Sequence, residues 1–201
     1  AGITWQSEAH PEFLHPDDQE YLEEIKLEDE AFYQEELNSI LPHLNRVSRF
    51  DDRLYLAGET GLLAYSDDFG RQWQRMDINY EGSFFDIRKL ASGKLLAAGL
   101  RGNLFEFDPD NQSWFRIDSG SQSSLNSIVE TDNQDALVVG NNGNLVCMED
   151  RIVEQEQTPE SEAIINAVSY NGQLVAVTAV GIQILDSQKE SSTCKRINSS
   201  L

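Results

Sequence analysis

Short apolar or alternating segments recur from residue 44 onward, separated by turns rich in Gly, Asn and Asp. Such segments are typical of half-buried antiparallel strands. We predict four groups of strands a, b, c and d, which are listed here in chain order. Strand a covers 44–50, 84–90, 125–130 and 164–170, and strand b covers 54–57, 94–98, 136–139 and 173–177. Strand c covers 62–65, 104–107, 145–148 and 182–185, and strand d covers 73–78, 114–117, 152–155 and 193–197.

Pairs of glycines separate strands b and c, and each pair follows the one before it by 41 residues: Gly58 and Gly61, Gly99 and Gly102, Gly140 and Gly143. Trp73 and Trp114, at the start of strand d, are also 41 residues apart. In the fourth group the stretch 179–182 replaces the glycine pair. A repeat near 40 residues with four short strands predicts a β-propeller blade, so the fold class is all-β.

The first group contains the full pattern S-x-D-x-G-x-x-W of an Asp-box, formed by Ser66, Asp68, Gly70 and Trp73. Short Ser and Asp side chains hydrogen-bond the backbone of their own turn, and glycine tolerates a positive φ. We therefore predict a structural role for this motif and no catalysis. The second group keeps Trp114 but has lost the Ser and Gly positions.

Gly2 and Trp5 have the spacing of the end of another Asp-box, so we expect residues 1–5 to form strand d of a preceding blade. Further blades are then expected upstream of Ala1. The four blades, at about 44–80, 81–120, 121–160 and 161–201, would belong to a seven-bladed ring.

Residues 6–43 form an acidic insertion that is predicted to be helical. Twelve Asp and Glu residues precede Asn45, against the single lysine Lys26. Pro16 suits a first helical position, acids follow it, and Pro42 marks the end. Two interpretations remain open. A helix or helical hairpin packs on the side or rim of the propeller with solvated acids, or the insertion is a docking arm that exposes apolar side chains, namely Phe32, Tyr33, Leu37 and Ile40.

Composition narrows the possible partners. The net charge of −20 disfavours nucleic acid and anionic lipid surfaces, and the chain has no apolar run long enough to span a membrane. His10, Glu12 and His15 have no spacing that suits a metal, so neither a metal nor a cofactor is expected. Cys147 and Cys194 are expected in different blades, packed without a disulfide.

The glycine pairs and the Asp-box make residues 44–197 similar to the Asp-box (BNR-like) propellers of the photosystem II stability and assembly factor family and its non-photosynthetic bacterial relatives. The resemblance implies a seven-bladed propeller without enzymatic activity, exported to a lumen or periplasm, that helps to assemble a membrane-protein complex. It also implies an export signal upstream of Ala1, and a role for some bacterial relatives as accessories to exporters. The acidic insertion and the small number of blades depart from this family.

We therefore predict a non-enzymatic protein-interaction module, an assembly factor or accessory subunit that docks through a propeller face and the acidic insertion. The predicted partner-binding residues are Phe32, Tyr33, Leu37, Ile40, Arg88 and Arg101. The alternative is a sialidase-like glycoside hydrolase or carbohydrate-binding propeller, which would need an arginine cluster, a tyrosine and acids. Its candidates are Arg46, Arg49, Arg88, Arg101, Tyr80 and Glu81, although no spacing among them requires catalysis.

Overall fold

The computed structural model describes residues 10–131, 134–149 and 152–185. Their strands form three four-stranded sheets and one three-stranded sheet, each antiparallel and in chain order. Blade 1 contains β1 (Leu44–Phe50), β2 (Arg53–Gly58), β3 (Leu63–Ser66) and β4 (Gln74–Arg75), and blade 2 contains β5 (Phe84–Lys89), β6 (Leu95–Gly99), β7 (Asn103–Asp108) and β8 (Ser113–Asp118). Blade 3 contains β9 (Leu125–Glu130), β10 (Ala136–Gly140), β11 (Asn144–Glu149) and β12 (Ile152–Gln157), and blade 4 contains β13 (Ile164–Tyr170), β14 (Gln173–Thr178) and β15 (Gly181–Leu185).

These sheets are the blades of a β-propeller, as predicted. The predicted strands within the described residues are present, and most of their ends agree within one or two residues. The largest difference is in blade 1, where the strand predicted at 73–78 covers only Gln74–Arg75. The strands predicted at 1–5 and 193–197 lie outside the described residues.

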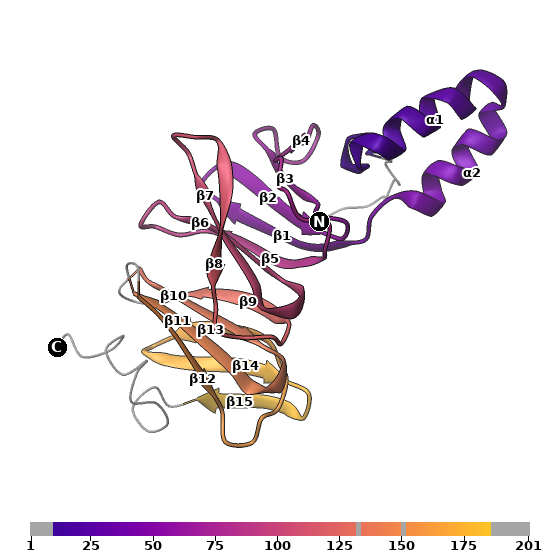
Figure 1. Cartoon of the computed structure of the whole chain (residues 1–201). Coiled ribbons are helices and arrows are strands. Elements are labelled where there is room, and N and C mark those ends of the chain that lie inside the picture. Colours follow the sequence, from indigo (N-terminus) through magenta and orange to yellow (C-terminus); the bar gives the residue numbers. More distant parts are fainter. Residues whose placement is uncertain (1–9, 132–133, 150–151, 186–201) are drawn as a thin grey trace, which may run out of the picture.

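Hydrophobic clusters hold successive blades together. Leu63 of blade 1 packs with Phe84 and Ile87 of blade 2, and similar clusters join blades 2 and 3 and blades 3 and 4. Among the described residues no such cluster joins blade 4 to blade 1. The four blades therefore form an open arc (Figure 1).

The outer face of blade 4 has the composition of a blade interface. Val129 and Val139 of blade 3 are buried against blade 4. Val168 and Val177, which hold the same places in the register of blade 4, are 54% and 47% exposed. No blade within the described residues covers this face.

The glycine pairs let each b–c turn pack closely against its surroundings. A Cβ at Gly99 would collide with the carbonyl oxygen of Ser83, which accepts a 3.0 Å hydrogen bond from the amide of Leu100. Gly102 has a φ of +72°, and a Cβ there would collide with the carbonyl of Ser121, in the loop that leads to the next blade. The first glycine thus holds the turn against the loop before strand a, and the second holds it against the link between blades.

The acidic insertion forms a short 3-10 turn, η1 (Pro11–Phe13), and a hairpin of two helices, α1 (Pro16–Glu28) and α2 (Glu30–Ile40). Asp29 separates the helices because its carboxylate accepts hydrogen bonds from the amides of Ala31 and Phe32, at 2.9 and 3.1 Å, and so caps α2. Figure 1 shows the hairpin projecting outward from blade 1. We call this hairpin the arm.

Cys147 lies in β11 and is buried, as expected for strand c of blade 3. The expectation that it packs without a disulfide is wrong, since Cys147 is disulfide-bonded. Cys194 lies outside the described residues. None of the helices in the described ranges is long and apolar enough to cross a membrane.

The close approach at Gly102 generates the first prediction. Gly102→Ala should destabilise the protein by about 3 kcal/mol, because a positive φ is unfavourable for alanine and its Cβ meets the Ser121 carbonyl. Gly93→Ala is the matched control. Its φ is +94° but nothing lies within 4 Å, so it should cost only about 1 kcal/mol. Urea unfolding followed by tryptophan fluorescence measures both, and equal losses would contradict the role of the close approach.

Candidate functional site

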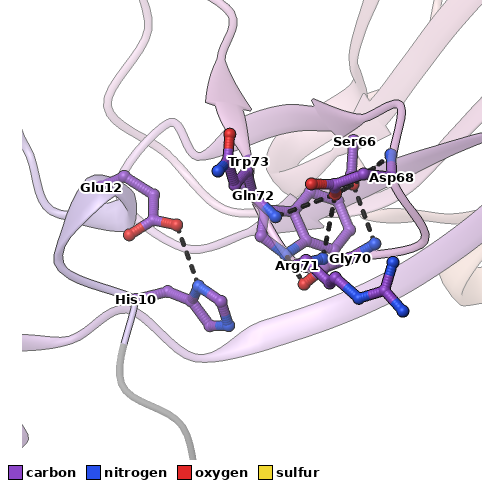
Figure 2. A network of polar contacts seen from close by, with 8 residues as sticks. All are labelled: His10, Glu12, Ser66, Asp68, Gly70, Arg71, Gln72 and Trp73. Carbon is purple, nitrogen blue, oxygen red and sulfur yellow. Dashed lines mark hydrogen bonds and ion pairs between the residues drawn. The ribbon is translucent and has the colours of Figure 1, made fainter.

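The Asp-box forms a closed network of hydrogen bonds in the turn between β3 and β4 (Figure 2). The Ser66 hydroxyl donates to Asp68 and accepts from the Gly70 amide, both at 2.8 Å. Asp68 also accepts from the amides of Arg71 and Gln72, at 3.0 and 2.9 Å. The Trp73 indole donates to the Gly70 carbonyl at 3.1 Å. The bonds satisfy the turn itself, in keeping with a structural motif.

Trp73 also supports the base of the arm. The Phe13 ring of η1 meets it edge to face, with centroids 5.6 Å apart. Phe13 is 4% exposed and packs with Leu56 and Leu62 of blade 1. His10 directly precedes η1, and its Nδ1 atom forms a 2.9 Å hydrogen bond with the Glu12 carboxylate (Figure 2). The Asp-box turn thus forms part of the surface to which the arm is attached.

Arg75 makes the polar part of this attachment. Its guanidinium donates to the Phe13 carbonyl at 2.7 Å and to the Thr60 carbonyl at 3.2 Å. Burial lowers the pKa of Arg75 from its ordinary value, while the Asp77 and Asp18 carboxylates act in the opposite direction. Strand d of blade 1 therefore holds the base of the arm through one arginine.

The arm exposes a different apolar set from the predicted one. Leu37 is 4% exposed and packs with Leu14 and Leu22 between the helices, so the expectation that it is exposed is wrong. Tyr33 and Ile40 are half-buried against the same cluster, and only Phe32, at 44%, is exposed as expected.

Two exposed apolar residues of the arm were not predicted as partner-binding residues. Leu27 is 89% exposed and Tyr21 is 47% exposed. Leu27 lies in the last turn of α1 and Phe32 in the first turn of α2, so both are near the tip of the arm. Asp29 is the signal that could have indicated the exposure of Leu27. Because α1 ends there, Leu27 lies in the last turn of the helix, beyond the buried Leu22.

The two predicted partner-binding arginines do not share a patch. Arg88 pairs with Leu96 towards the far end of β5. Arg101 is exposed in the turn that follows Gly99. Gly99 pairs with Phe84, so this turn lies at the opposite end of β5 from Arg88.

A buried carboxylate instead joins three innermost strands. Asp86 of β5 is fully buried, accepts a 2.8 Å hydrogen bond from the Ile128 amide of β9, and lies 3.4 Å from Arg46 Nε of β1. One Asp86 oxygen and the Nε atoms of Arg46 and Arg88 are buried without a hydrogen bond. Burial raises the pKa of Asp86, against the effects of the Ile128 amide and the two arginines. This cluster links blades 1, 2 and 3.

The residues of the hydrolase alternative are divided among separate groups. Arg46 and Arg88 flank Asp86, whereas Arg49 donates to the Asp51 carbonyl and to Asp52. The Tyr80 hydroxyl accepts a 3.2 Å hydrogen bond from the Asn103 side chain. In the part of the chain that the structure describes, no group of three or more His, Cys, Asp or Glu residues is arranged to hold a metal.

Solved propeller structures are similar to this chain. YCF48 bound to a D1 peptide matches with a TM-score of 0.60 and 14% identity, over 72% of this chain and 51% of that one. Virginiamycin B lyase from Staphylococcus aureus gives 0.58 and 9%, over 71% and 55%. An extracellular domain of a hybrid two-component system from B. thetaiotaomicron gives 0.58 and 19%, over 74% and 22%.

This chain thus spans about half the length of YCF48 and of the lyase. At these identities the similarity shows the fold alone. No family model and no curated protein matches the chain.

The hydrogen bonds of Asp68 generate the second prediction. Hydrogen bonds from the Gln72 backbone N–H and the Ser66 hydroxyl lower the pKa of Asp68 below its usual range. A lowered pKa contributes stability above the unfolded-state value near 4, and this contribution is lost as pH falls through the folded-state pKa. The stability advantage of the native protein over Asp68→Asn should therefore shrink below about pH 4. Urea unfolding across pH measures it, and an advantage that grows in acid would refute the assignment.

Asp86 generates the third prediction, with the opposite sign. A raised pKa gives stability that is fully present below the unfolded-state value and lost as pH rises through the folded-state pKa. The native protein should therefore gain stability relative to Asp86→Asn as pH falls from neutral towards about 4. The same unfolding series measures this difference. A difference that is independent of pH would show that burial does not govern this carboxyl.

Proposed function

We propose that this chain is a protein-interaction module that serves as an assembly factor or accessory subunit of an extracytoplasmic membrane-protein complex or exporter. In this proposal the propeller blades are the scaffold and the arm is the docking element. The observation that carries the proposal is the projecting arm with its exposed Leu27, Phe32 and Tyr21.

The shape of the arm favours docking over simple packing on the propeller. Its apolar interior is filled by Leu14, Leu22 and Leu37, and its base is attached through Phe13 and Arg75. Leu27 and Phe32 belong neither to this interior nor to the cluster at the base. We propose that these side chains are the apolar anchors of a contact with a partner protein.

Charge defines the kind of partner. Residues 10–43 contain eleven Asp and Glu residues against Lys26 alone. Such a field attracts a basic surface, raises the association rate and makes that rate sensitive to salt. We infer a partner that presents basic residues around a small apolar contact.

The similar structures support a binding role and an extracytoplasmic location. One is of YCF48 with a bound peptide of D1, and another is an extracellular domain of a two-component system. The similarity to virginiamycin B lyase leaves enzymatic chemistry open for the fold, but the described residues gather no catalytic set of the hydrolase type. We therefore propose a non-enzymatic module, and completion of a seven-bladed ring by further blades.

Removal of the apolar tip of the arm is the fourth prediction. Leu27→Ser with Phe32→Ser should reduce recovery of a membrane-protein partner about tenfold, because two anchoring side chains are lost. Both residues are exposed, so the stability of the protein should change by less than about 0.5 kcal/mol. The measurement is a pull-down from detergent-solubilised membranes of the source cells, with the recovered proteins quantified by mass spectrometry.

The matched control is Phe115→Ser with Ile152→Ser, which removes two exposed apolar residues, one each from blades 2 and 3. Recovery should not change with this pair. An equal loss in both variants, or no specific partner with the native protein, would overturn the proposed docking role of the arm.

A further inference from the structure

Two hollows adjoin each other where the arm meets blades 1 and 2. One, of about 560 Å³, lies along α1 and includes Leu22, Lys26 and Tyr33 in its lining. The other, of about 540 Å³, extends to Tyr80 and Trp114. Both are lined by Pro16, Arg75 and Asp77, so they meet at these residues, and we call the two together the junction groove.

An unused donor lies in the lining of this groove. Trp114 of blade 2 holds the place that Trp73 holds in blade 1. Trp73 donates its indole N–H to the Gly70 carbonyl, but Asn111 replaces that glycine in blade 2. The Nε1 atom of Trp114 is buried and has no hydrogen-bond partner. This atom is closed to solvent, so an acceptor on a ligand can reach it only if the indole ring turns towards the groove. A buried donor without an acceptor is costly, and gaining an acceptor would favour that turn.

The charged residues of the groove favour a basic occupant. Four carboxylates line it, against two cations: Glu12, Glu23, Asp77 and Glu81, against Lys26 and Arg75. Both cations already have partners within the chain. Lys26 lies over the Tyr33 ring at 5.0 Å, and Arg75 is bound to backbone carbonyls. Asp77 and Glu81 are exposed and appear in no hydrogen bond or ion pair among those described.

The dimensions suit an extended segment. Pro16 and Lys26 both line the groove, and their separation of ten residues corresponds to about 15 Å along α1. About five residues of extended peptide, at 3.3 Å each, cover that length. An extended peptide also exposes the backbone carbonyls that an indole N–H can bind.

We propose that the junction groove binds an extended, basic segment of the protein partner. Its Lys or Arg side chains lie against Asp77 and Glu81, and one of its backbone carbonyls accepts the indole N–H of Trp114 once the ring has turned towards the groove. The inference rests on the proposed docking function and specifies the chemistry of the bound segment. In this proposal blade 2 contributes Glu81 and Trp114 to binding, in addition to the residues of the arm.

A phage library of random 12-residue peptides tests the proposal on the full chain without knowledge of the partner. The library is first depleted on the double variant Asp77→Asn, Glu81→Gln and then selected on the native protein. The expected result is enrichment of peptides that contain Lys or Arg. A selected peptide, made synthetically and labelled, should bind the double variant about tenfold more weakly than the native protein, less so at high salt.

Two further measurements separate this groove from general attraction to an acidic protein. Glu149→Gln with Glu154→Gln removes two exposed carboxylates from blade 3 and should leave the affinity unchanged. The indole N–H resonance of Trp114, assigned with Trp114→Phe, should move downfield when the peptide is added. No enrichment, enriched peptides without basic residues, equal weakening in both charge variants, or an unmoved Trp114 resonance would overturn the proposal.

The outcome is distinguishable from failure of the proposed function. If the arm tip is needed for recovery of the membrane partner but the groove selects no basic peptide, docking holds and the groove assignment is wrong. If basic peptides bind the groove but the tip variant recovers the partner normally, the docking role of the arm is wrong.

Discussion

Close contact between the b–c turn and neighbouring carbonyl groups is the constraint on which the stack of blades depends. The first glycine of each pair brings the turn against the loop before strand a, and the second brings it against the link to the next blade. A Cβ at either place would collide with a backbone carbonyl oxygen or, at Gly143, with the Thr158 hydroxyl. These close turns accompany the apolar clusters that pack each blade against the next.

Much of the propeller can be predicted from the sequence because its signals are local. Alternation over a few residues gives the strands, and glycine spacing gives their grouping. The Asp-box is equally local, since Ser66, Asp68 and Gly70 bond within one turn. Even where the blade 2 motif has drifted, Trp114 alone keeps the register visible.

Features that depend on more than one element were harder to predict. Leu37 was predicted to be exposed on a docking arm, whereas the Asp29 cap divides the insertion into two helices that enclose Leu37 between them. Asp86 and Arg46 meet across blades, so no short pattern links them. The same holds for Arg75, whose partners Phe13 and Thr60 lie 62 and 15 residues away.

The arm contributes no strand to any blade, and it enters and leaves the scaffold at blade 1. Its length, charge and tip can therefore change without altering a single blade-to-blade contact. Evolution could change the partner of such a molecule by altering about thirty residues of the arm, while selection for stable packing between blades acts on the remainder. The blades are thus constrained by their contacts with one another, and the arm is the part that is free to diverge.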